Sequence, residues 1–227
     1  MTDGLRIEVT LPAPVDDVWP AFRDPDLIRQ WHGWEDPGLA DEIRMIFADG
    51  TTVEEEGRSL HVGGHRFTFE PAGAQTIVRV VRAAPIDPGE LDWDLYYDEV
   101  DEGWLSFVQQ LRFALAHQWG ATRHTVHLDG TAPAPTRVAA ALGLPAAAEG
   151  ERYTAAVAGE TLTGTVWFRS AHQLGVTVDA WGPGLLIVAE APDGEGLAAS
   201  ATLSTYGPVD GDREARWTSA WRAIYPG

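Results

Sequence analysis

Residues 94–119, DLYYDEVDEGWLSFVQQLRFALAHQW, form the one long helical pattern in a chain otherwise rich in short β-like runs. Apolar residues recur there at steps of three and four, at Trp104, Phe107, Val108, Leu111, Leu115 and Trp119. This spacing predicts one apolar face on a helix about 25 Å or more long, at roughly 1.5 Å rise per residue. A helix of that length needs a large apolar partner. We expect a curved sheet whose concave face grips Trp104, Leu111 and Trp119.

The residues before this helix supply the strands of such a sheet. Residues 5–11, LRIEVTL, alternate apolar and polar side chains as a half-buried strand does, and Pro12 ends the run. Two short helices should follow, the second beginning at Asp24-Pro25, an N-cap with proline in the first helical position. Glycine-containing turns then separate further β-like runs at 42–47, 51–55, 59–69 and 75–82. We expect an antiparallel meander.

The residues after the long helix repeat this order of elements. A strand at 123–128 and a short helix at 134–142 are followed by a closing helix at 212–225. Between these helices, strands are predicted at 152–157, 162–169, 175–181, 185–190 and 198–205. We therefore predict two domains, residues 1–120 and 121–227, the second a divergent copy of the first. A single domain followed by an unrelated β-rich tail is the alternative.

Three segments of the first half carry a family resemblance. APVDDVWPAFRDPDLIRQWHGW (13–34), VGGHRFTFEPAG (62–73) and DWDLYYDEVDEGWLSFVQQLRFAL (92–115) look like the START-like (SRPBCC) superfamily. They most resemble the branch named after the activator of the heat-shock-protein ATPase, including the Gly103-Trp104 pair in its closing helix. The resemblance covers roughly residues 5–120. It implies an α+β helix-grip fold, with a curved antiparallel sheet wrapped around a long C-terminal helix and an apolar cavity between them.

Composition and charge exclude several functions. The chain contains no cysteine and no lysine, which removes thiolate metal sites, cysteine nucleophiles and Schiff-base chemistry. The net charge is −18, with −14 in residues 1–120 and −4 in residues 121–227. Such a chain should repel phosphate backbones and anionic lipid surfaces. We expect a cytoplasmic protein that binds no nucleic acid and does not insert into membranes.

Motifs for catalysis and for metal binding are absent or weak. The sequence has no GxGxxG after a strand, no P-loop, no HExxH and no nucleophile elbow. His61 and His65 flank a turn and could hold zinc with Glu70, but two imidazoles are fewer than the four ligands of a structural site. We expect no metal and no cofactor. Exposed hairpin histidines are the simpler interpretation.

Candidate ligand-binding residues come from the long helix, the strands opposite and the tryptophans of both halves. They are Trp31, Arg66, Arg79, Tyr96, Tyr97, Trp104, Val108, Leu111, Trp181 and Trp221. An inward-facing arginine near a tyrosine could bind a carboxylate or polarise a carbonyl, whereas arginines on the outer face of the sheet would only be solvated. The ten tryptophans could line pockets or fill the cores, since each ring buries some 150–250 Å2.

Three functions are compatible with the sequence. The first is binding of a hydrophobic small molecule, such as a lipid, a polyketide or an aromatic metabolite, as the START-like resemblance implies. The second is a polyketide cyclase or hydrolase, for which Tyr96, Tyr97, His61, His65 and Arg66 are the nearest acid–base candidates. The third is an interaction protein that modulates a chaperone ATPase. We favour a binding protein over an enzyme. The apolar run at 185–188 suggests contact with the first domain, a homodimer, or simply a central strand.

Overall fold

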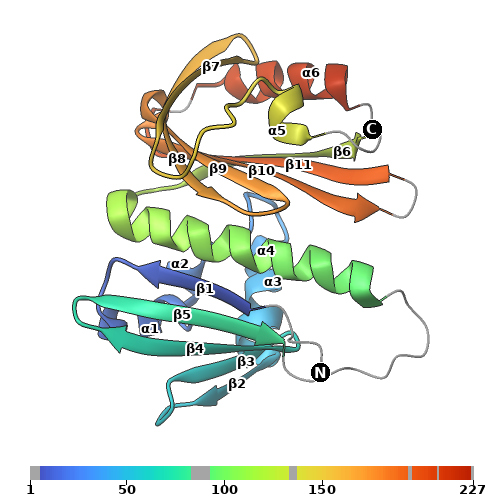
Figure 1. Ribbon diagram of the computed structural model, residues 1–227. Coiled ribbons are helices and arrows are strands. Elements are labelled where there is room, and N and C mark those ends of the chain that lie inside the picture. Colours follow the sequence, from blue (N-terminus) through green and yellow to red (C-terminus); the bar gives the residue numbers. More distant parts are fainter. Residues whose placement is uncertain (1–5, 83–92, 133–136, 194–195, 209, 226–227) are drawn as a thin grey trace. The chain divides into compact units, whose positions relative to one another are not determined.

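The protein has an α+β fold with two antiparallel sheets and a C-terminal helix (Figure 1). The computed structural model describes residues 6–82, 93–132, 137–193, 196–208 and 210–225. The chain divides into two compact units, residues 1–121 and 122–227, and each is considered by itself. Within the described ranges, no helix is both long and apolar enough to span a membrane.

The described residues of the first unit form five strands, four α-helices and two short π-helical segments. In chain order these are β1 (Arg6–Leu11), α1 (Val15–Ala21), α2 (Pro25–Ile28), α3 (Leu39–Arg44), η1 (Met45–Asp49), β2 (Thr51–Glu54), β3 (Ser59–Val62), β4 (His65–Ala72), β5 (Gln75–Arg82), α4 (Trp93–Phe113) and η2 (Ala114–Gln118). The strands form one antiparallel sheet in the order β1-β5-β4-β3-β2. The first strand therefore pairs with the last, Arg6 opposite Val81 and Leu11 opposite Thr76.

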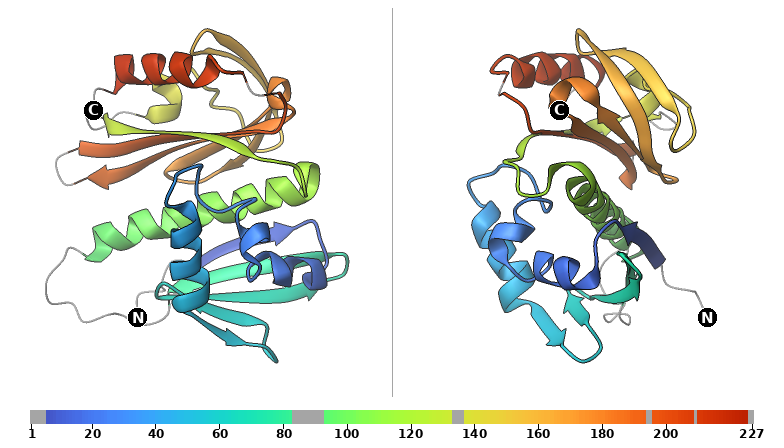
Figure 2. Two further views of the ribbon diagram at one scale, coloured as in Figure 1. Left: turned by 180° about the vertical axis from the view of Figure 1, so that it is seen from behind. Right: turned by 90° about the vertical axis from the view of Figure 1, so that its left-hand side faces the viewer.

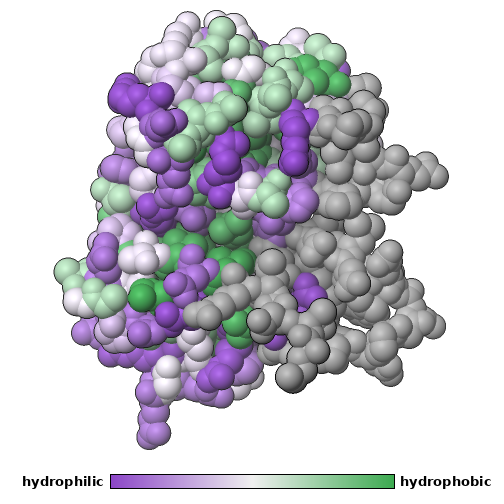
Figure 3. Space-filling model, in the orientation of Figure 1, coloured by the Kyte–Doolittle hydropathy of each residue, from purple (hydrophilic) through white to green (hydrophobic). Residues whose placement is uncertain are grey.

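Alternation along the strands decides which face of this sheet is covered. On β4, His65, Phe67 and Phe69 are buried, whereas Arg66 points to the opposite, exposed face. Helix α4 packs on the buried face, and the indole of Trp104 meets the ring of Phe67 edge-on, with 4.9 Å between ring centroids. Hydrophilic residues cover the β2–β3 end of this unit in the space-filling view (Figure 3).

Two local predictions for the first unit are wrong. Residues 42–47 are not a strand but parts of α3 and η1, because Leu39, Ile43 and Phe47, four apart, bury one helical face. Trp119 does not join the apolar face of the long helix and is 38% exposed. The π-helical turns of η2 break the 3.6-residue period ahead of it, and its own backbone is extended.

In the second unit, the part that the structure describes forms six strands, two α-helices and one 3-10 turn. They are β6 (His124–Ala132), α5 (Val138–Ala141), β7 (Arg152–Val157), β8 (Glu160–Arg169), β9 (Gln173–Val178), η3 (Asp179–Trp181), β10 (Gly184–Asp193), β11 (Gly196–Thr205) and α6 (Arg213–Ile224). The sheet order is β6-β11-β10-β9-β8-β7, so the first strand again lies beside the last.

Both helices of the second unit cover the same face of its sheet (Figure 2). Trp217 and Trp221 of α6 and Val138 of α5 share one core with Leu186 and Val188 of β10. A β-bulge separates Val166 from Phe168, and beyond it the ring of Phe168 covers Gly175 on the neighbouring strand. The sheet is therefore curved around its helices.

Candidate functional site

The best-defined cavity of the described residues lies in the second unit, between α5 and the sheet. We call it the α5 pocket and define it by its lining, residues 137–140, 144–146, 169–174 and 188–190. Its volume is about 410 Å3. Four buried side chains make it apolar at the core side, namely Val138, Leu144, Leu174 and Val188.

Small side chains explain why space remains there. Three alanines line the pocket from α5 and the segment after it, and two more from the sheet side: Ala139, Ala140, Ala146, Ala171 and Ala189. Among the described residues that line the pocket, none is Phe, Tyr or Trp. The helix itself is a single turn, because Gly143 follows it with a positive φ of 75°. A short helix with methyl side chains cannot fill the gap above the strands.

Glu190 of β10 is the one acidic side chain among the described residues that line the pocket, and two groups donate hydrogen bonds to it. Its side chain is only 8% exposed. One carboxylate oxygen accepts from the backbone N–H of Val138 at 2.8 Å, and the other accepts from Nη1 of Arg137 at 2.5 Å. The same Arg137 nitrogen donates to the carbonyl of Ala171 at 2.9 Å. The buried charge is thus paired, as burial requires.

The β8–β9 turn forms the other polar side of the pocket. Nη2 of Arg169 donates to the carbonyls of Pro145 and Ala147, both at 3.0 Å, and this fixes the segment after α5. The hydroxyl of Ser170 accepts from the backbone N–H groups of His172 and Gln173 at 3.1 and 2.9 Å. The guanidinium groups of Arg137 and Arg169 are exposed, so the pocket meets solvent between cationic side chains.

Tyr225, directly after α6, lies over the helix-covered face of the sheet, near the strands that carry Gly130 and Glu190. Gly130, Ala199 and Glu190 lie opposite one another on β6, β11 and β10. A Cβ on Gly130 would stand 3.0 Å from the Cβ of Tyr225, so the missing side chain makes room for the tyrosine. Within the described chain, the buried Tyr225 hydroxyl has no hydrogen-bond partner. Burial raises the pKa of Tyr225, and the charge of Glu190 raises it further.

Four of the predicted site residues lie together in the core of the first unit. Trp31, Trp104, Val108 and Leu111 are buried there. The indole of Trp31 packs against Phe22 at 4.7 Å between centroids and donates to the carbonyl of Ala21. Rings of His32, Phe47, Phe67 and Phe107 surround Trp104. These contacts match the filled-core interpretation of the tryptophans.

The two predicted arginines do not face that core. Arg66 donates to Glu54 at 3.3 Å, and Arg79 donates to Glu8 at 2.6 Å and to Glu70. Both project from the sheet face opposite Phe67 and Val78, because alternate residues of a strand point to opposite faces. The outer-face alternative therefore describes them. Tyr96 and Tyr97 lie in the part of α4 whose side chains are outside the described residues.

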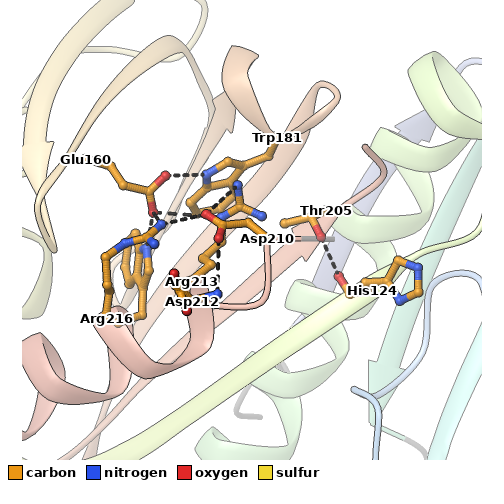
Figure 4. Close-up of polar contacts among 9 residues, drawn as sticks. His124, Glu160, Trp181, Thr205, Asp210, Asp212, Arg213 and Arg216 are labelled. Atoms are coloured by element: carbon orange, nitrogen blue, oxygen red, sulfur yellow. Dashed lines mark hydrogen bonds and ion pairs between the residues drawn. The ribbon is translucent and has the colours of Figure 1, made fainter. Parts of the chain in front are cut away.

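Trp181 and Trp221 are buried in the second unit, where their indole N–H groups are hydrogen-bonded. Trp181 and Trp217 donate to the two oxygens of Glu160, at 3.2 and 2.7 Å. Figure 4 shows Arg213 and Arg216 of α6 beside this carboxylate, each 3.8 Å from it. Trp221 donates to the carbonyl of Asp129 at 2.9 Å. This arrangement anchors α6 to the sheet.

Of the eight predicted residues whose side chains are described, none lines the α5 pocket. Sequence reasoning followed aromatic residues, whereas this pocket is lined by alanines. One signal was available, since Glu190 is the only acidic residue in the apolar run LLIVAEA, residues 185–191.

The two histidines weighed as zinc ligands do not come together. The ring of His65 is buried on the core face, near the carbonyl of Gly63, whereas His61 lies on the outer face 3.6 Å from Glu54. Over the described part of the chain, no group of three or more His, Cys, Asp or Glu side chains is placed to hold a metal ion.

No protein-family model and no curated protein matches the chain. Among solved structures, DynU16, a protein in the dynemicin biosynthetic locus, aligns with 99% of this chain and 96% of its own, at 19% identity and a TM-score of 0.33. The di-domain ARO/CYC StfQ from the steffimycin biosynthetic pathway aligns over 93% of this chain and 90% of its own, at 12% identity and a TM-score of 0.38. For the di-domain ARO/CYC BexL from the BE-7585A biosynthetic pathway, 98% of each chain aligns at 15% identity and a TM-score of 0.35. At these TM-scores the likeness is too weak to support a statement about function.

Proposed function

We propose that this protein binds a hydrophobic small molecule, and that the α5 pocket of the second unit is the site. The observation that carries the proposal is the cavity of about 410 Å3 that reaches the buried side chains of Val138, Leu174 and Val188. Small-molecule sites are concave, mostly apolar and of roughly 300–1,000 Å3, with a few placed polar groups that fix orientation. The volume of the α5 pocket lies within this range, and the paired Glu190 and Arg137 supply fixed polar groups.

We also propose that both units are helix-grip folds and that the second is a divergent copy of the first. The common strand order supports this, because in each sheet the first strand pairs with the last and a helix closes the unit. The START-like resemblance of residues 5–120 implies binding of lipids, polyketides or aromatic metabolites between sheet and C-terminal helix. The proposed site differs, since it lies beneath the helix that follows the first strand of the unit.

The test fills the pocket without disturbing the core. Ala140 is exposed on α5 and lines the pocket, whereas its neighbour Ala141 is also exposed and does not line it. We expect Ala140→Phe to weaken binding of anthracenemethanol, a neutral flat probe, by about tenfold or more, because the new ring takes up space that the probe needs. Ala141→Phe should bind as the unchanged protein does. Titration with the probe's own fluorescence is the measurement, since no tryptophan of the described residues lines the pocket.

Two outcomes would contradict the proposal. One is the absence of saturable binding of any apolar probe to the unchanged protein. The other is equal weakening by Ala140→Phe and Ala141→Phe, which would place the bound probe elsewhere or trace the loss to the fold of α5. The cyclase and chaperone alternatives stay predictions: of their candidates, His61 and Arg66 are paired with Glu54 and His65 is buried.

A further inference from the structure

Two of the seven arginines in residues 121–227 lie at the α5 pocket, in a protein of net charge −18. Arg137 and Arg169 come from different sides of the pocket, one before α5 and one at the end of β8. Their positive charges stand against one carboxylate in the lining, Glu190. The lining thus carries an excess of positive charge.

The carboxylate of Glu190 neutralises the charge of Arg137 and does not neutralise that of Arg169. Arg137 lies 2.5 Å from the Glu190 carboxylate, so this pair is neutral as a unit. Arg169 makes no ion pair with any carboxylate of the described residues; its Nη2 donates to two neutral carbonyls instead. A guanidinium keeps its charge at any physiological pH and has five N–H donors in a planar fork. Arg169 is therefore a held cation with donor capacity left over.

An apolar surface adjoins this cation. The buried side chains of Leu144 and Leu174 line the same pocket, one on the segment that Arg169 fixes and one on β9. A ligand whose apolar body covers these residues would place a polar end at Arg169. An anionic end would form the strongest hydrogen bonds with Arg169, because hydrogen bonds between ionised partners are roughly twice as strong as neutral ones.

We propose that the ligand of the α5 pocket is an apolar carboxylic acid, with its carboxylate bound by Arg169 and its body against Leu144 and Leu174. This inference rests on the proposed function, because it assigns the polar end of a molecule in that same pocket. Glu190 does not oppose such an anion strongly, since Arg137 and the backbone N–H of Val138 already pair with its carboxylate.

The test compares two probes that differ only in the polar end, anthracene carboxylate and anthracenemethanol. We expect the unchanged protein to bind the carboxylate about tenfold more tightly than the alcohol. Raising the salt concentration should reduce this preference, because the rim of the pocket is exposed. In Arg169→Gln, the preference should fall to about twofold or less, because only the carboxylate loses an ionic partner. Arg152→Gln is the matched control, because Arg152 is 69% exposed and pairs with Asp179 away from the pocket.

The outcomes separate the two proposals. Equal affinity for both probes in the unchanged protein overturns the anion inference and leaves the proposed function standing. If neither probe binds, the proposed function fails and the inference fails with it. If Arg169→Gln weakens both probes equally, Arg169 acts only by holding the Pro145–Ala147 segment, and the inference is overturned. Arg169→Lys, which keeps the charge, should retain most of the preference for the carboxylate.

Discussion

In the first unit, the segment between the first strand and the meander fills the core, whereas in the second unit the same segment leaves a pocket. The first segment runs from α1 to η1 and buries Phe22, Trp31 and Phe47, with 4.7 Å between the ring centroids of Phe22 and Trp31 and 5.8 Å between those of Trp31 and Phe47. In its described part, from residue 137 on, the second segment contains one helix, the single turn α5, followed by an alanine-rich stretch. Each segment follows the first strand of its unit, and in each unit that first strand pairs with the last one.

The comparison separates what topology decides from what side-chain volume decides. Pairing of the first strand with the last gives both units a sheet with one covered face. Whether space remains under that cover depends on the residues that point into it. Among the described residues, aromatic rings pack against one another under the cover of the first unit, whereas methyl groups leave about 410 Å3 in the second.

The largest expected effect comes from removing the ring at the centre of the filled core. Trp104 is 6% exposed and packs against the rings of several described residues, including Phe67 and Phe47. We expect Trp104→Ala to lower the free energy of unfolding by about 3–5 kcal/mol, the usual cost of a large aromatic-to-alanine change in a core. Urea unfolding followed by far-ultraviolet circular dichroism measures this loss.

Trp119→Ala is the control for this prediction. Because Trp119 is 38% exposed, we expect a loss of about 1 kcal/mol or less. Similar losses for the two variants would contradict a closely packed Trp104.

Most of the fold followed from hydrophobic periodicity. The predicted α+β class is confirmed, and the apolar period of residues 94–119 predicted the long helix to within a few residues. The errors lie where two periods compete. In residues 39–47 the spacing of Leu39, Ile43 and Phe47 outweighs the β-like look of EIRMIF, and π-helical turns such as η2 have no periodic signal of their own.

The candidate site could not be predicted in the same way, because a pocket is an absence of volume. Aromatic residues attract attention in a sequence, yet Trp31 and Trp104 fill space. The residues that leave space are alanines such as Ala140 and Ala171. An alanine in a sequence does not by itself indicate a pocket. The pairing of Arg137 with Glu190 spans 53 positions, and only the strand order brings the two together.

A smaller effect is expected from the carboxylate that anchors α6. Both oxygens of Glu160 accept an indole N–H, from Trp181 and Trp217. Glu160→Gln keeps one acceptor and turns an amide N–H2 toward the other indole, which leaves a largely buried donor without an acceptor. We expect a loss of about 1–3 kcal/mol in the free energy of unfolding by urea. Glu214→Gln, an exposed position in the first turn of α6, should stay within about 0.5 kcal/mol. Equal effects would mean that the indole hydrogen bonds contribute little.

The finest test of the comparison uses one substitution at two tryptophans. Trp221 donates its indole N–H to the carbonyl of Asp129 at 2.9 Å, whereas the buried N–H of Trp104 has no partner within the described chain. Tryptophan to phenylalanine removes the same atoms from both cores but breaks a hydrogen bond only in the second unit. We therefore expect Trp221→Phe to cost about 1 kcal/mol more than Trp104→Phe in urea unfolding. An equal or larger cost at Trp104 would show that ring volume, and not the hydrogen bond, decides how tightly each helix is held.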